Sequence, residues 1–294
     1  MGGILLVDKP GGITSHDVVA RARRALGTRK IGHAGTLDPM ATGLLVLGVD
    51  SATRLLTYLV GLDKTYEATI RLGVATDSDD ADGTVTATAD AAAVAAVPDA
   101  AIAAGIADLT GAISQVPSRV SAIKVNGRRA YDLARAGEEV QLNARAVTVS
   151  RFVVRGRRDG AGVLDLDVVV DCSSGTYIRA LARDLGAALG VGGHLTALRR
   201  TRIGPFDVAD AVGVDDIAAA ALLPQAQVAA SVLGAFPVTA DEARDLRHGK
   251  RLTGAAARLG TERAAAIDPE GRLVGIVERR GDDVKSAMNV SEES

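Results

Sequence analysis

The ionisable side chains of one short loop are the first candidates for chemistry in this chain. The loop runs from Gly32 to Gly43 and holds only two such groups, His33 and Asp38. Its three glycines, proline and two threonines exclude a helix, and the apolar run 44–49 that follows is typical of a buried strand. A rigid element therefore holds an irregular loop, where catalytic groups often lie. Alternatively, Asp38 followed by Pro39 could serve only to begin a turn.

Two further residues would complete a site around Asp38. A carboxylate that must stay ionised in a cleft as a nucleophile needs a charge partner, and a guanidinium also donates in-plane hydrogen bonds. Arg179 is the candidate for that partner. A tyrosine with an open ring face can stack on an unstacked base, and Tyr66 stands near the start of the next expected strand.

Two other chemistries fit the sequence less well. His16 and Asp17, with the two ionisable groups of the loop, could bind a divalent metal. The first turn of a helix explains Asp17 equally well, because a carboxylate there meets the helix dipole favourably. Six residues separate Cys172 from Arg179, one more than in a cysteine phosphatase loop, so we interpret Cys172 as a small buried residue.

Length and composition indicate a globular protein of one large or two ordinary domains. The chain has 294 residues, of which 47% are hydrophobic and 24% charged. A single cysteine excludes a disulfide framework. No apolar stretch is long enough to span a membrane, and the apolar start is too short for a secretory signal. We expect a soluble cytoplasmic protein that is a monomer.

The charge is unevenly distributed along the chain. The net charge of −2 argues against a polyanionic partner, but residues 76–110 hold seven aspartates and no basic residue. Residues 115–205 hold fifteen Lys and Arg against eight Asp and Glu. A polyanion responds to the local field rather than to the sum, so an RNA partner is compatible with this sequence. The acidic stretch 76–83 is interpreted as a solvated loop.

The periodicity predicts an α+β fold with a mixed or antiparallel sheet, because strands and helices follow no strict βαβ rhythm. Strand-like patterns occupy residues 3–7, 44–49, 64–73, 147–154, 163–172 and 194–206, with a basic turn at 155–158. Helices are expected at 15–26 behind a Thr14-Ser15 cap, at 51–60 behind Ser51, in two short pieces over 91–107, and after the cap cluster 173–176.

The C-terminal part has a different pattern. Residues after about 223 resemble a linker rich in alanine and proline, and a new pattern begins at Val238. A helix over 241–248 should end at Gly249. Strands at 263–267 and 272–278 should flank a hairpin turn, and the last residues from 289 should fray. We expect a small, mostly β accessory domain.

Six motifs in the same order carry a resemblance to a known family. They are DKPGGITS at 8–15, the loop GHAGTLDPMATG at 32–43, KTY at 64–66, SAIK at 121–124 with Gly127 and Tyr131, CSSGTYIR at 172–179, and residues 193–202. These motifs are spread over nearly the full length of the chain. In them the chain resembles the bacterial tRNA pseudouridine-55 synthases of the TruB family. The central loop is the most specific of the six.

The resemblance implies the reaction and the roles of the candidate residues. Uridine 55 in the T loop of tRNA would become pseudouridine without cofactor or metal. Asp38 would be the nucleophile, Arg179 its ion-pair partner, and Tyr66 the ring that stacks on the flipped uracil. Whether Asp38 attacks C1′ or C6, or first removes a ribose proton, stays open. Residues implied to bind or buttress are His33, Lys9 with Pro10, Tyr177, Leu198, Lys124, Arg128, Arg129 and Arg202.

The family fold implies two domains and an insertion. A catalytic domain would span residues 1–230, with an RNA-gripping insertion at about 118–142 and a PUA-like β domain at 236–290. The partner would be the T-arm stem-loop of tRNA, with no membrane. Three alternatives stay open: a synthase of the same fold that acts on another RNA, a noncatalytic tRNA-binding or tRNA-refolding protein, and a metal phosphohydrolase.

Overall fold

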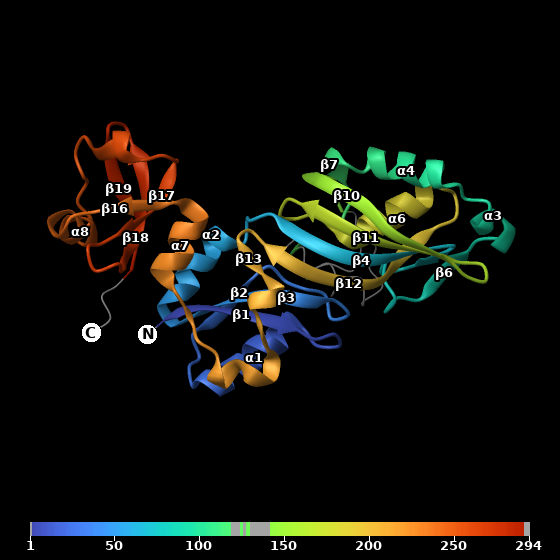
Figure 1. The fold of residues 1–294 in the computed structure, drawn as a ribbon, viewed down its shortest axis with the longest axis horizontal. Helices are drawn as coiled ribbons and strands as arrows, with labels where there is room; N and C mark the ends of the chain where they lie inside the picture. The colour runs from blue at the N-terminus through green and yellow to red at the C-terminus, as the bar shows by residue number, and fades with distance from the viewer. Residues whose placement is uncertain (1, 119–123, 126–127, 130–141, 291–294) are drawn as a thin grey trace.

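The computed structural model describes residues 2–118, 124–125, 128–129 and 142–290. A large mixed sheet with helices occupies most of the chain, and a second sheet lies near the C-terminus at the far end of the molecule (Figure 1). The α+β fold and the mixed sheet predicted from the sequence are confirmed.

The large sheet runs in the order β14-β1-β3-β12-β4-β11-β10-β7, with β2, β13 and β15 paired to its members. Its pairs are antiparallel except β1 with β14 and β3 with β12. The strands are β1 (Gly3–Lys9), β2 (Ile31–Ala34), β3 (Thr42–Val49), β4 (Lys64–Leu72), β7 (Gly111–Gln115), β10 (Arg145–Asp159), β11 (Leu164–Cys172), β12 (Gly193–Ile203), β13 (Phe206–Asp207), β14 (Val212–Gly213) and β15 (Leu223–Pro224).

Helices cover this sheet and connect its strands. They are α1 (Ser15–Leu26), α2 (Leu56–Leu59), α3 (Ala91–Ala95), α4 (Asp99–Asp108), α6 (Ile178–Ala188) and α7 (Gln225–Leu233), with 3₁₀ turns η1 (Asp50–Leu55), η2 (Val208–Asp210) and η3 (Val214–Ala219). A capping box begins α1, since the Thr14 hydroxyl accepts from the Asp17 amide and the Asp17 carboxylate accepts from the Thr14 amide. Ser15 therefore lies inside the helix.

The alternation along β4 separates the two faces of the sheet. Tyr66, Ala68 and Ile70 are buried in the main core, which also contains the apolar face of α6. Glu67, between them, is exposed on the other face. A strand that buries alternate residues places one side-chain set toward the core and the other outward. The face that carries Tyr66 is therefore the one covered by α6.

Several local expectations were wrong. Ser51 caps no helix, since it lies within η1, whose cap residue Val49 makes no side-chain bond. Residues 155–158 continue β10 instead of turning, because all four pair with or flank β11. The cluster 173–176 forms a turn, and Tyr177 holds the N-cap position of α6. At 155–158, pairing with β11 overrides the local turn propensity.

The expected linker after residue 223 is also wrong, because α7 occupies Gln225–Leu233. Val228 and Ala229 are buried on this helix, and Ala229 packs in a cluster with Leu273 and Ile276 of the second sheet. An alanine-rich stretch is a good helix former once its apolar side has a partner. The segment therefore joins the two sheets as a packed helix.

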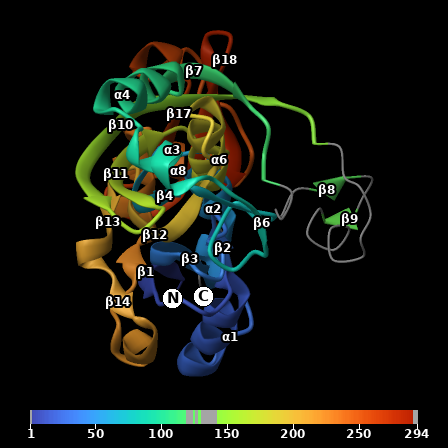
Figure 2. The same cartoon turned by 90° about the vertical axis from the view of Figure 1, so that its right-hand side faces the viewer.

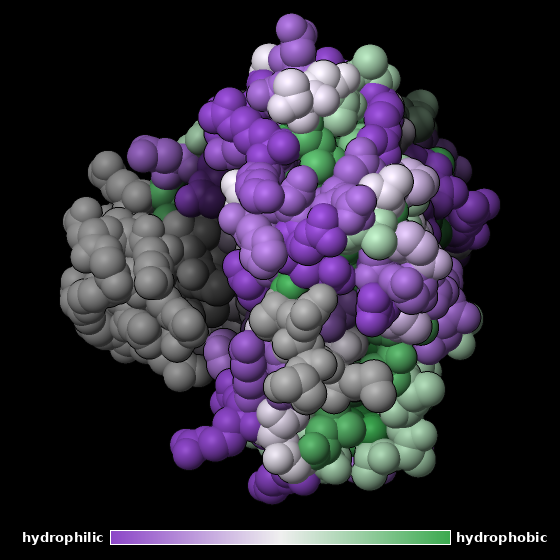
Figure 3. Space-filling model, turned by 90° about the vertical axis from the view of Figure 1, so that its left-hand side faces the viewer, coloured by the Kyte–Doolittle hydropathy of each residue, from purple (hydrophilic) through white to green (hydrophobic). Residues whose placement is uncertain are grey.

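The second sheet forms a small C-terminal unit in the order β16-β17-β18-β19. Its elements are β16 (Ala235–Pro237), α8 (Ala240–Arg247), η4 (Ala255–Arg258), β17 (Arg263–Ile267), β18 (Leu273–Arg280) and β19 (Asp283–Asn289). The predicted helix and hairpin are confirmed, and β16 and β19 were missed. Hydrophilic side chains cover much of the outer face of this unit (Figure 3). Ion pairs such as Arg258 with Glu242 link its elements.

Four further strands lie away from the main sheet. β5 (Val74–Thr76) pairs with β6 (Val85–Thr88), and β8 (Lys124–Val125) pairs with β9 (Arg128–Arg129). The β8–β9 hairpin stands to one side of the molecule (Figure 2). It belongs to the expected insertion at 118–142, most of which lies outside the described residues.

Candidate active site

The loop that carries Asp38 connects β2 to β3. Gly32 to Ala34, expected to begin the loop, instead extend β2, which pairs with β3. The irregular part is therefore residues 35–41. Gly43 at its end requires glycine, because its φ is +102° and an added Cβ would lie 2.2 Å from the carbonyl oxygen of Arg200. Close packing of β3 on β12 thus fixes where the loop returns to the sheet.

Asp38 forms an ion pair with Arg179 of α6. The Arg179 Nε lies 3.0 Å from Asp38 Oδ2, and its Nη2 donates to Oδ1 at 3.2 Å. Two contacts from one planar guanidinium hold the carboxylate in a defined orientation. The Arg179 side chain is only 3% exposed, whereas that of Asp38 is 35% exposed. The carboxylate is thus fixed from behind and open to the cavity in front.

A second carboxylate on the far side of Arg179 was missed by the sequence analysis. Arg179 Nη1 donates to Asp80 Oδ2 at 3.1 Å and to the carbonyl of Ser78 at 2.7 Å. The Asp80 side chain is 6% exposed. The interpretation of residues 76–83 as a solvated loop was therefore wrong. One arginine bridges two buried or half-buried carboxylates.

The acidic loop docks on α6 through a second arginine as well. Arg183, one helical turn after Arg179, contacts Asp79 at 3.2 Å. The Asp79 carbonyl accepts from the Leu195 amide of β12 at 3.0 Å, and Asp79 has a left-handed φ of 61°. Arginines spaced i, i+4 lie on the same helix face, so two adjacent aspartates can meet them. The only sequence signal for this docking was that spacing.

The charges of this cluster have opposing effects on the pKa of Asp38. Burial raises the pKa of Asp38, the Arg179 guanidinium opposes that rise, and the nearby Asp80 carboxylate adds to it. The Arg179 guanidinium therefore favours the ionised form of Asp38. A nucleophilic or basic role would require that ionised form.

A cavity of about 380 Å³ lies in front of Asp38. Tyr66 and Leu198 line it, each 7% exposed, together with Tyr177 at the start of α6. The Gln115 side chain binds the backbone of Tyr177 in both directions, at 2.8 and 3.0 Å, and so fixes that wall. The structure thus brings Asp38, Tyr66, Arg179, Tyr177 and Leu198 to one cavity.

Lys9 supports the loop from behind. Its side chain is fully buried, and its Nζ donates to the carbonyls of Pro10, Ile13 and Pro39 at 2.9, 2.8 and 3.2 Å. Burial lowers the pKa of Lys9 to about 8, while the Asp38 carboxylate works against that lowering. Lys9 does not line the cavity, so its contacts fit the buttress that the resemblance implied.

Two other expected site residues, His33 and Arg202, lie outside the cavity. His33 on β2 contacts His16 edge to face at 5.5 Å, and its pKa is lowered chiefly by burial. Arg202 donates to Thr65 Oγ1 at 3.1 Å on the other face of the sheet. Lys124, Arg128 and Arg129 lie on the β8–β9 hairpin, and their side chains lie outside the described atoms. Contacts of these residues with RNA stay predictions.

Cys172 ends β11 and is buried, as the sequence analysis expected. Burial raises its pKa to about 11. A thiol in that state is a poor nucleophile near neutral pH. This agrees with the interpretation of Cys172 as a packing residue.

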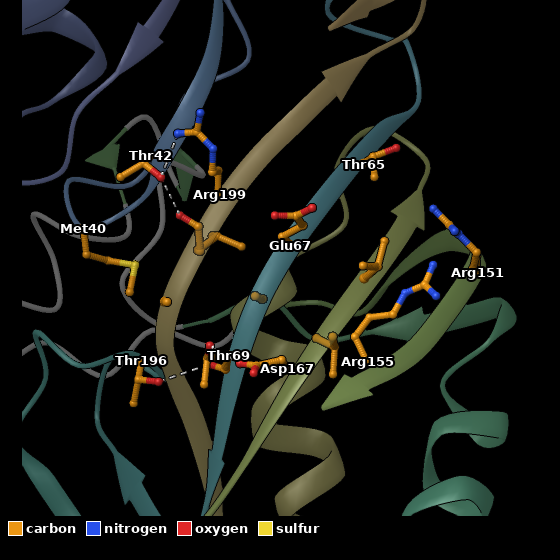
Figure 4. A pocket seen from close by; sticks show the side chains of 15 residues that line it. Met40, Thr42, Thr65, Glu67, Thr69, Arg151, Arg155, Asp167, Thr196 and Arg199 are labelled. Carbon is orange, nitrogen blue, oxygen red and sulfur yellow. Dashed lines mark hydrogen bonds between the residues drawn. The ribbon is translucent and has the colours of Figure 1, made fainter. Parts of the chain in front are cut away.

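A larger hollow of about 780 Å³ lies on the opposite face of the sheet. Figure 4 shows Thr65, Glu67 and Thr69 along β4, with arginines of β10 on one side and Arg199 on the other. Arg199 is paired with Asp8 at 2.7 Å. This hollow lacks Asp38, Tyr66 and Arg179, so the smaller cavity is the candidate active site.

Three family models together match residues 23–291 of the chain. Residues 23–178 match the TruB family pseudouridylate synthase N-terminal domain. Residues 179–243 match the tRNA pseudouridylate synthase B C-terminal domain, and residues 234–291 match the C-terminal model of tRNA pseudouridine synthase II. This chain belongs to the TruB family of pseudouridylate synthases. It is therefore an isomerase, as the six motifs predicted.

Curated TruB-family proteins are similar over almost the whole chain. The tRNA pseudouridine synthase B of Leifsonia xyli subsp. xyli is 59% identical over 290 residues, which cover 98% of this chain and 96% of that protein. The tRNA pseudouridine synthase B of Nocardia farcinica is 58% identical, with 96% of this chain and 90% of that protein covered.

Solved structures share the TruB-family fold. A chain of an H/ACA RNP bound to a substrate RNA containing 2′-deoxyuridine superposes with a TM-score of 0.72 at 24% identity, covering 98% of this chain and 85% of that one. A chain of the archaeal box H/ACA sRNP Nop10-Cbf5 complex gives 0.69 at 25% identity, covering 99% and 85%. The C-terminal PUA-like unit is part of this shared fold.

Two features of other protein classes are absent from the described residues. None of the helices there is long and apolar enough to cross a membrane. No three or more His, Cys, Asp or Glu side chains within those residues are grouped so as to hold a metal ion.

Proposed function

We propose that this TruB-family enzyme converts uridine 55 in the T loop of tRNA into pseudouridine, with Asp38 as the nucleophile. One observation carries the proposal: a carboxylate held by Arg179 faces a cavity lined by the ring of Tyr66. A binding protein would not need an ionised carboxylate turned toward an RNA chain rich in phosphates. The high identity to relatives named tRNA pseudouridine synthase B supports the tRNA substrate.

The reaction is an isomerisation that needs no external reactant. The N1–C1′ bond breaks, the uracil turns in the cavity, and C5 bonds to C1′. The proton at C5 leaves and a proton is gained at N1, so atoms and electrons balance. Asp38 acts as nucleophile and Arg179 keeps it ionised and oriented. Tyr66 stacks on the flipped base near C5, and Leu198 excludes water from one wall.

Pure protein incubated with a synthetic T-arm stem-loop tests the proposal directly. We expect pseudouridine at position 55 only, at an unchanged rate in the presence of a metal chelator. Product on another RNA and none on the T arm would favour a synthase with a different substrate. Binding or refolding of tRNA without any product would favour the noncatalytic alternative, and activity lost to chelator would favour metal chemistry.

Tyr66 provides a prediction that separates stacking from proton transfer. Tyr66→Phe keeps the ring, so it should retain most activity if Tyr66 only stacks, and should fail after glycosidic cleavage if the hydroxyl handles the C5 proton. Tyr66→Leu removes both and should lower the rate about 10²-fold or more. Tyr58→Phe, which loses a hydroxyl outside the cavity, is the control. A normal rate in Tyr66→Leu would remove the ring from the site.

The expected RNA contact of the β8–β9 hairpin predicts a change in salt dependence. Each phosphate contact contributes roughly −0.7 to −0.9 to the slope of log affinity against log salt. Neutralising Arg128 and Arg129 together should flatten that slope by about one to two units, with little change in the rate at saturating RNA. Neutralising Arg157 and Arg158, which pair with aspartates on β10 and its neighbours, should leave the slope unchanged. An unaltered slope in the first variant would mean that both arginines are only solvated charges.

Three further properties complete the proposal. The catalytic domain would span residues 1–230 and carry the insertion, and the PUA-like domain would span 236–290. The enzyme would act in the cytoplasm as a monomer. Light scattering and limited proteolysis test the last property and the domain boundaries.

A further inference from the structure

Arg200 is a buried cation to which the reaction proposed for Asp38, Tyr66 and Arg179 assigns no role. It lies on β12, its side chain is 1% exposed, and it is among the largest fully buried side chains of the described residues. Its Nε donates to the Leu44 carbonyl at 2.8 Å, Nη2 to the Gly35 carbonyl at 3.0 Å, and Nη1 reaches the Thr36 carbonyl at 3.5 Å. Backbone carbonyl oxygens therefore interact with the positive charge of its guanidinium. A buried charge held in this way is costly and calls for a function.

The contacts of Arg200 join the two ends of the Asp38 loop. Its guanidinium bonds at Gly35, where the loop leaves β2, and at Leu44, just after the loop returns. Its backbone pairs with Gly43 in the β3–β12 register, so closely that no Cβ fits at Gly43. An added Cβ at Gly35 would lie 3.5 Å from Arg200 Nη1. One residue thus contacts the segments before and after Asp38.

The same residue faces Tyr66. Arg200 lies directly opposite Tyr66 in the β4–β12 register, and both line the cavity. Burial raises the pKa of Tyr66, while the charge and a side-chain hydrogen bond of Arg200 oppose that rise. The guanidinium therefore lies between the loop that carries Asp38 and the ring expected to stack on the base.

We propose that Arg200 is a positioning residue for this reaction, which sets the place of the Asp38 loop relative to the ring of Tyr66. This inference rests on the proposed function. Arg179 orients the carboxylate of Asp38, whereas Arg200 places the backbone beneath it. Three carbonyls in different directions fit a planar fork with several donors, and an ammonium at the end of a lysine cannot reach all three. Errors of about 1 Å in such placement lower rates by about 10²-fold.

The test compares Arg200→Lys with Arg199→Lys, the adjacent arginine, which lies outside the cavity and pairs with Asp8. We expect the single-turnover rate at saturating RNA to fall about 10²-fold in Arg200→Lys, with the Kd for tRNA within about twofold of wild type. Arg199→Lys should change neither. Each rate is divided by the folded fraction of the variant, which is measured by circular dichroism.

A pH profile separates positioning from a general loss of stability or charge. Charged or titratable groups around Arg200 are Lys9, His33, Lys64 and Tyr66, and Arg200 is not among the chief causes of the raised pKa of Asp38. The acid limb of the rate should therefore stay where it is in Arg200→Lys. Unchanged turnover per folded molecule would overturn the proposal, and so would a moved acid limb.

A second variant keeps the proposal testable if Arg200→Lys does not fold. Gly35→Ala leaves the buried arginine in place but strains a residue with φ of +81° and crowds the guanidinium. It should show the same fall in rate with tRNA binding kept, and wild-type turnover in it would contradict the proposal. Turnover of the T-arm stem-loop by the wild-type enzyme is measured first. Its absence would reject the proposed function, whereas the ratio of variant to wild type concerns Arg200 alone.

Discussion

Replacement of Asp38 by asparagine should abolish isomerisation while tRNA binding stays nearly intact. The amide keeps the shape of the carboxylate but loses its negative charge and its nucleophilicity, so the rate should fall about 10⁴-fold or more. Arg179 would lose one of its two carboxylate partners and keep Asp80, so the fold should survive. Pseudouridine formation under single-turnover conditions and a filter-binding Kd measure the two effects.

The matched control for this substitution is Glu67→Gln. It also converts a carboxylate into an amide, but on the exposed face of β4, outside the cavity. Its rate should match that of the wild type. Appreciable turnover by Asp38→Asn, in a preparation free of wild-type enzyme, would remove Asp38 from the role of nucleophile.

The pH dependence of the wild-type enzyme follows from the same group. Burial raises the pKa of Asp38 above the 3.8 of an exposed aspartate. Activity that requires the ionised form is complete at pH values above this raised pKa and falls as pH decreases through it. The acid limb of the rate should therefore lie above pH 3.8 and vanish with Asp38.

The loop of Asp38 could be predicted because its signal is local. Glycines at fixed places, a proline and a following apolar run identify an irregular loop before a buried strand without any tertiary information. Tyr66 was placed for the same reason, since alternation along β4 is visible in the sequence. Arg179 came from its motif and from the charge that a buried carboxylate needs.

Asp80 could not be recognised in this way. A run of aspartates with a glycine is typical of a solvated loop, and nothing local shows that two of them are buried. Their burial depends on Arg179 and Arg183, about a hundred residues later in the chain, which meet Asp80 and Asp79. Arg200 was missed for a related reason, because alternation is interrupted by register shifts along β12. Which arginine of that strand is buried follows from the sheet register.

Arg179→Lys should have the second largest effect, although it conserves charge. The guanidinium fork of Arg179 contacts Asp38 twice, Asp80 once and the Ser78 carbonyl once. An ammonium cannot reproduce that fork, so the Asp38 carboxylate loses its orientation and the rate should fall about 10²-fold or more. Arg151→Lys, at an arginine bonded to Asp171 outside the cavity, is the control and should turn over normally.

Arg179→Met separates the charge of Arg179 from its geometry. Without the guanidinium, Asp38 and Asp80 face each other with no cation between them, so the pKa of Asp38 should rise further. The acid limb of any residual activity should then move to higher pH, whereas in Arg179→Lys it should move little. Removal of one partner of a buried ion pair costs about 3 to 5 kcal/mol, and the lower value fits here because Asp38 is 35% exposed. Chemical denaturation measures that loss. Near wild-type kinetics in the lysine variant would contradict an oriented pair, and an unmoved limb in the methionine variant would contradict the role of Arg179 in keeping Asp38 ionised.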